Sequence, residues 1–152
     1  MEQINSSLKE LNDFNLKVNS DLIRHIKASG TTNERVLLLL SHIISAHQIW
    51  NGRINGQIEN IAVFGLRDFD DLSQQVVANH VATKAILESK KETDEVIYIN
   101  TKGTKFSNSI SQILLHVYNH HAYHRGQINQ LLVQEGNAAM VADYIVYNRN
   151  EI

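Results

Sequence analysis

Cysteine and proline are both absent from this chain of 152 residues. The lack of cysteine excludes disulfide bonds, thiolate nucleophiles and cysteine-ligated metal sites. Without proline, no position must interrupt a helix through a missing backbone N–H group. The length suits one domain with a single core, and we expect residues 1–152 to form it.

An excess of one charge and long hydrophobic runs are also lacking. The 14 Lys and Arg residues nearly balance the 16 Asp and Glu residues, so general attraction to nucleic-acid phosphates is not expected. The longest aliphatic run, residues 36–40, falls far short of the about 20 residues that a membrane span needs. Residues 1–10 are polar and contain no apolar signal region. We therefore expect a cytoplasmic protein that binds neither nucleic acid nor membrane.

Four segments carry apolar residues at the three- and four-residue steps of an amphipathic helix. They predict an all-α four-helix bundle with helices at about residues 2–29, 33–54, 70–91 and 107–134. The second segment is apolar almost all round, which is typical of a central helix. Before the fourth, β-prone residues on both sides of Gly103 predict a small hairpin of residues 96–99 and 104–106, and residues 138–149 predict a short docked helix.

Local signals place the ends of these helices. Thr31, Thr32 and Asn33 offer caps for the second helix, and Thr31 with Glu34 has the spacing of a capping box. Ser107 or Asn108 is expected to cap the fourth helix. Gly126 lies inside the fourth helix, where glycine destabilises by about 1 kcal/mol relative to alanine. Close approach of a neighbouring helix would explain it.

Half of the eight histidines fall in one stretch of the fourth helix. His116, His120 and His124 are four residues apart and therefore lie on one face, while His121 points elsewhere. This ladder overlaps the apolar stripe, so we expect it to face the core. Buried imidazole nitrogens need partners, and a metal ion chelated by two histidines one turn apart is one solution. Hydrogen-bonded core histidines are the alternative.

A third ligand is expected from the second helix, where His42 and His47 are the candidates. They are five residues apart and point to different faces. Both lie on apolar stripes, so periodicity does not choose between them.

The chain resembles the DinB-like (DinB/YfiT-like) family of metalloenzymes over nearly its whole length. The resemblance rests on Ser41-His42-Ile43 with Trp50 eight residues after the histidine, and on the motifs His116, Asn119-His120 and His124-Arg125-Gly126-Gln127. It implies a four-helix bundle, commonly dimeric, with a divalent metal on His42, His120 and His124. It also implies an outer position for His47 and a hydrogen-bonded core position for His116.

Three histidine ligands would leave a coordination position open for water or a substrate, as in catalytic zinc sites. Nitrogen ligands suit zinc or nickel first, and iron or copper next. Trp50, Asn119 and Tyr123 are candidates for lining the pocket.

The resemblance implies a metal-dependent enzyme, such as a thiol S-transferase in detoxification or stress response, with a small thiol or an electrophile as substrate. A metal-dependent hydrolase, a non-catalytic metal-binding dimer and a plain helical interaction module are the alternatives.

Overall fold

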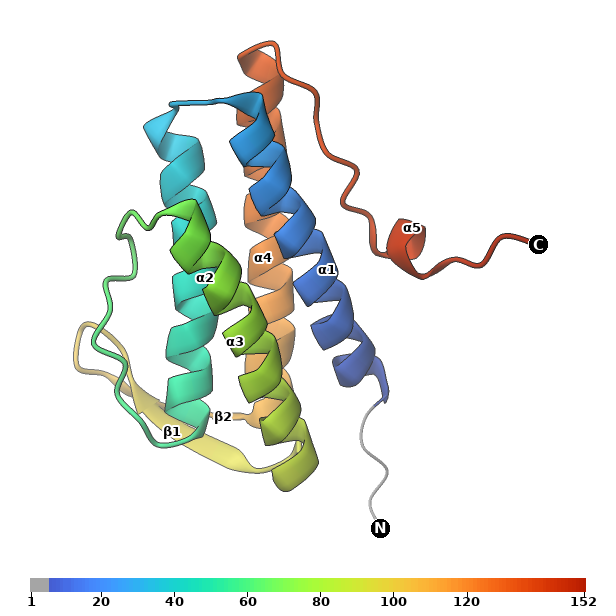
Figure 1. Ribbon diagram of the computed structural model, residues 1–152. Coiled ribbons are helices and arrows are strands. Elements are labelled where there is room, and N and C mark those ends of the chain that lie inside the picture. Colours follow the sequence, from blue (N-terminus) through green and yellow to red (C-terminus); the bar gives the residue numbers. More distant parts are fainter. Residues whose placement is uncertain (1–5) are drawn as a thin grey trace.

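The computed structural model describes residues 6–152, which are mostly helical and include one small hairpin (Figure 1). The helical class, the hairpin and the short last helix are thereby confirmed, and residues 2–5 of the predicted first helix lie outside the described residues. The elements in chain order are α1 (Ser6–Ser29), α2 (Glu34–Ile54), α3 (Phe69–Ser89), β1 (Glu95–Ile99), β2 (Lys105–Ser109), α4 (Ile110–Gln134) and α5 (Tyr144–Asn148).

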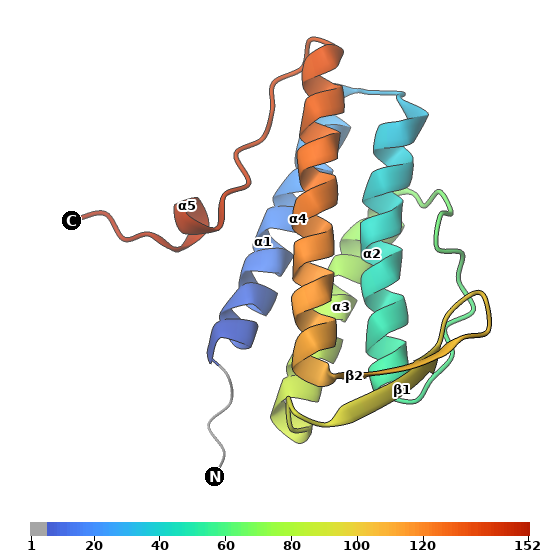
Figure 2. The same cartoon turned by 180° about the vertical axis from the view of Figure 1, so that it is seen from behind.

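The four long helices lie side by side, and each packs against two of the others. α2 contacts α3 and α4, and α1 contacts the same two helices from the opposite side. Most of α2 is buried, as its apolar sequence predicts. The hairpin crosses one end of α2 and α4, where Val96 joins the buried cluster (Figure 2). None of the described helices is both long and apolar enough to cross a membrane.

The cap of α2 is one of the three predicted candidates, but the predicted capping box does not form. Asn33 caps α2 by accepting from the backbone N–H groups of Arg35 and Val36, so the predicted capping box of Thr31 and Glu34 is wrong. Asn33 directly precedes the first turn, and its short side chain reaches those N–H groups. The Thr31 hydroxyl instead accepts from the N–H group of Asn33.

The cap of α4 lies one or two residues later than predicted. Ser107 and Asn108 are held in β2 by antiparallel pairing with Ile97 and Val96, so neither caps the helix. Ser109 is the cap, and it forms a capping box with Gln112.

Among the described residues, Gly126 has no close neighbour that would explain a glycine at this position. A Cβ built there meets no atom within 4 Å outside the surrounding backbone, so the expected close approach of another helix is wrong for this chain.

Candidate metal centre

Three histidines from two neighbouring helices converge at the boundary between α2 and α4, which lie side by side in Figure 2. His42 comes from α2, and His120 and His124 come from consecutive turns of α4. The Nε2 atom of His120 lies 3.0 Å from that of His42 and 3.0 Å from that of His124. One nitrogen from each ring lies within 4.8 Å of the other two.

Hydrogen bonds on the far side of two rings decide where their protons are. Nδ1 of His42 donates to the backbone carbonyl of Val63 over 2.8 Å. Nδ1 of His124 donates to Oε1 of Gln127 over 2.6 Å. Because a neutral imidazole carries one N–H group, both Nε2 atoms present bare lone pairs to His120.

This arrangement of lone pairs favours a positive charge between the rings. A proton on Nε2 of His120 can serve only one of the two short nitrogen–nitrogen contacts at a time. A divalent cation between the rings would accept all three lone pairs. Nitrogen ligands at about 2.0–2.1 Å from a tetrahedral zinc ion are about 3.3 Å apart, close to the two short separations here. The three residues therefore fit a metal ion.

Burial favours the neutral form of His42 and His120 by lowering the pKa of both rings. It lowers the pKa of His120 to about 4, helped by the neighbouring His124 and His42. Burial likewise lowers the pKa of His42, although its hydrogen bond to Val63 acts in the opposite direction. Neutral imidazole is the form that binds metal, so the lowered pKa of these two rings favours cation binding.

The loop between α2 and α3 covers His42. The Phe64 ring stacks on the imidazole with centroids 3.9 Å apart and an angle of 2° between the planes. Phe64 remains 56% exposed, so it borders solvent on its other side. Val63 and Phe64 were missed by the sequence analysis because the loop has no helical or strand periodicity.

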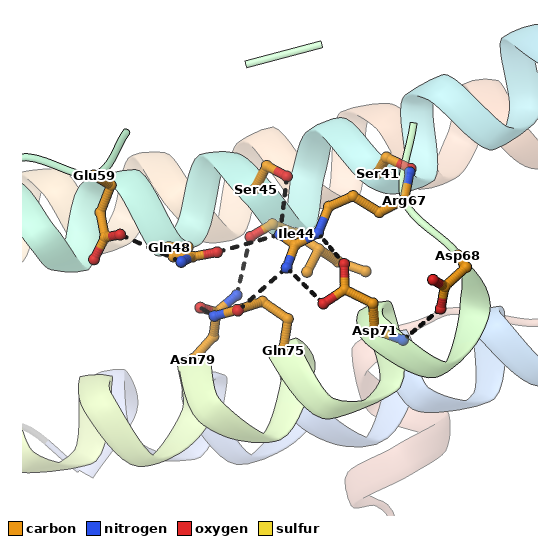
Figure 3. A network of polar contacts seen from close by, with 10 residues as sticks. All are labelled: Ser41, Ile44, Ser45, Gln48, Glu59, Arg67, Asp68, Asp71, Gln75 and Asn79. Atoms are coloured by element: carbon orange, nitrogen blue, oxygen red, sulfur yellow. Dashed lines mark hydrogen bonds and ion pairs between the residues drawn. The ribbon is translucent and has the colours of Figure 1, made fainter. Parts of the chain in front are cut away.

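A polar network anchors the end of that loop (Figure 3). The backbone N–H of Arg67 donates to Ser41, the neighbour of His42, over 3.1 Å. Its guanidinium bridges the helices by contacting Ser45, Gln48, Asp71 and Gln75. The position of Val63 under His42 is thereby tied to α2 and α3 together.

The predicted orientation of the histidine ladder is wrong. His116 is exposed, and His120 and His124 are only half-buried, whereas His121 is 1% exposed. The core stripe of α4 runs through Val117, His121 and Ile128, and the ladder lies on the flank beside α2. His116 is therefore no core histidine, and its ring stacks on His120 at 5.5 Å and touches Trp50 at 5.6 Å.

His47 lies away from the three converging rings. It is 3% exposed, and its Nε2 donates over 2.8 Å to the hydroxyl of Thr83, which itself donates to Asn51. Burial lowers the pKa of His47 to about 3. Its contact with the site is indirect, through an edge-to-face packing against His121.

The other residues predicted to line the pocket lie at the edge of the three-histidine site. Trp50 is half-buried and meets Tyr98 edge-to-face at 4.9 Å. Tyr123 is 65% exposed and touches the ring of His124 at 5.1 Å, and Asn119 is exposed.

Behind the site, α4 and α1 share a buried polar cluster that the sequence did not predict. Arg125 is 4% exposed and donates to the side-chain oxygens of Asn15 and Asn19. The amide nitrogens of both asparagines donate to Nδ1 of His121 over 3.0 and 2.9 Å. Arg125 and His121 therefore fix α4 on α1, which sets the rotation of α4 and so the direction of the ladder.

Comparison with known proteins supports the resemblance found in the motifs. The sequence model of the DinB family matches residues 2–151. Protein DinB of Bacillus subtilis (strain 168) is 29% identical over 83 residues, a match that covers 54% of this chain and 46% of that curated relative, about half its length. No solved structure matches the chain significantly. With the family model matching nearly its whole length, this chain belongs to the DinB family.

Proposed function

We propose that the protein binds one divalent metal ion through Nε2 of His42, His120 and His124 in a four-helix bundle of the DinB type. The observation that carries this proposal is the convergence of lone pairs, since Val63 and Gln127 hold the protons of two rings on the opposite nitrogen. Zinc, nickel, iron and copper all bind imidazole nitrogen, and we take zinc or nickel as the first candidates.

We further propose that the bound ion serves catalysis, with transfer of a small thiol to an electrophile as the reaction. A divalent ion with a free position lowers the pKa of a bound thiol or water near neutral pH. The three neutral rings add no negative charge, so an anionic thiolate is favoured there. The exposed Phe64 and Tyr123 lie beside His42 and His124, where an apolar electrophile could contact them.

The test is consumption of chlorodinitrobenzene in the presence of cysteamine by the metal-loaded protein. The thiolate sulfur forms a bond to the ring carbon, chloride leaves, and the thiol proton passes to solvent. We expect turnover that disappears in His120→Ala. Metal binding with no thiol-dependent turnover would instead favour the non-catalytic metal-binding protein, and turnover of esters without thiol would favour the hydrolase.

The protein is further proposed to act as a homodimer, because dimers are common in the resembling family and two-fold dimers are the commonest assembly. Light scattering across a concentration series should report twice the mass of 17.3 kDa. A constant value of one chain mass would contradict the dimer. The cytoplasmic location stays a prediction of the sequence.

A further inference from the structure

A cavity lies at the end of α2, away from the three histidines. Its volume is about 400 Å³, and it is bounded by α2, the loop after α2 and β1. Much of its lining is apolar, from Ile49, Ile58, Ile97 and Ile99, of which the last three are well exposed. Cavities of this size that combine apolar walls with a few polar groups are typical of small-molecule sites.

One unpaired cation lies in this cavity. The Arg53 guanidinium packs over the Trp50 ring at 4.5 Å and near the Tyr98 ring at 5.3 Å. Within the part of the chain that the structure describes, no carboxylate forms an ion pair with it. Glu59 also borders the cavity, but its carboxylate accepts from Gln48. A guanidinium held by two aromatic rings keeps its N–H groups free for an anion.

A row of rings joins this cavity to the histidines. His120 stacks on His116, His116 touches Trp50, and Trp50 carries Arg53. His42 and Arg53 lie on the same face of α2. At a helical rise of 1.5 Å per residue, Trp50 is about 12 Å and Arg53 about 16 Å along the helix axis from His42. This is the span of an extended small molecule.

We propose that this cavity binds the carboxylate end of an elongated, largely apolar ligand through Arg53, while the other end of the same ligand reaches the three histidines. The binding of an anion at Arg53 stands by itself, and the second half of the proposal rests on the proposed function. A matching ligand of the thiol class is a long mercaptocarboxylate.

The first test uses metal-free protein and so does not depend on the metal. Trp50 is the only tryptophan in the chain, and its fluorescence reports on Arg53 directly. We expect octanoate to bind at least about ten-fold more tightly than octanol, as a charge-assisted hydrogen bond allows. Arg53→Gln should abolish this preference and Arg53→Lys should keep part of it. Arg24→Gln, which removes one exposed charge from α1, should leave it unchanged.

Equal binding of octanoate and octanol, or an unchanged preference in folded Arg53→Gln, would overturn the proposal. An unchanged preference would mean that Arg53 only stabilises the C-terminal end of α2 through its interaction with the helix dipole. The Arg53→Gln variant would then show a lower free energy of unfolding and no change in ligand binding.

The second test uses protein loaded with cobalt, whose absorption spectrum changes when a thiolate binds. Mercaptoundecanoate, which spans the required distance, should bind more tightly than its neutral alcohol analogue, and Arg53→Gln should remove the difference. Mercaptopropionate, which is too short, should show no dependence on Arg53. Octanoate could bind through Arg53 while no thiolate binds to cobalt. That result would support the anion site at Arg53, but it would contradict both the link to the histidines and the proposed thiol chemistry.

Discussion

Val63 and Gln127 decide the chemistry of the histidine group although neither would touch a metal. Each accepts the Nδ1 proton of one imidazole and so directs the lone pair of the other nitrogen inward. The sequence contains Gln127 in the motif but gives no sign of its direction. The contribution of Val63 could not be predicted, since it is a backbone carbonyl placed by the folded loop.

Replacing Gln127 by alanine tests this role. Loss of the acceptor should free the ring of His124 and weaken metal affinity about 10–100-fold, as is typical for groups that orient ligands. Competition with a chromophoric chelator measures the change. Gln130→Ala, three residues on and exposed, is the matched control and should keep the wild-type affinity. Equal affinities for both variants would show that Gln127 does not orient the ring.

Helix α4 shows what the spacing of residues along a helix can predict and what it cannot. The spacing of His120 and His124 correctly places both rings on one face, because helix geometry fixes it. Which face turns inward could not be read, since polar and apolar residues alternate around the helix. The decision comes from Asn15 and Asn19, which accept from Arg125 and donate to Nδ1 of His121 and so make a polar stripe acceptable in the core.

Gly126 offers a test within the same helix. A methyl group there would meet no neighbour, so Gly126→Ala should raise the free energy of unfolding by about 0.5–1 kcal/mol through helix propensity. Urea unfolding followed by circular dichroism measures the change. A loss of stability would mean that a second copy of the chain packs closely at this position.

For the whole molecule, the four long helices, the hairpin and the last short helix were all predicted, because their patterns are long or bounded by glycine. The loop that covers His42 lies between the helices predicted at residues 33–54 and 70–91, and its path was not predicted. Its path depends on the bonds from Arg67 to α2 and α3, which come from residues far apart in sequence. Periodicity left His42 and His47 equivalent, and only the family resemblance favoured His42. The packing agrees with it, since Nε2 of His42 meets His120 while His47 bonds to Thr83.

Acidification should destabilise the folded protein. Burial lowers the pKa of His47 from 6.5 to about 3 and that of His121 well below its usual range. Below pH 6.5 the unfolded chain therefore binds more protons than the folded one. The stabilisation is complete above that pH and is lost as the pH falls, by up to about 1.4 kcal/mol per pH unit for each histidine.

Urea unfolding of metal-free protein between about pH 7.5 and pH 5 measures this slope. His47→Gln, which keeps a donor for Thr83, should make the slope shallower. Stability that does not change over this range would show that these histidines are not held neutral.

The metal content of three proteins purified without a histidine tag tests the central claim most directly. Elemental analysis should find one divalent ion per chain in the wild type, almost none in His42→Ala, and nearly the wild-type amount in His47→Ala, because only His42 shares the converging lone pairs. Circular dichroism confirms that each variant is folded, and His47→Gln replaces His47→Ala if the latter is not. Metal retained by His42→Ala, or lost from folded His47→Gln, would contradict the assignment of His42, His120 and His124 as the ligands.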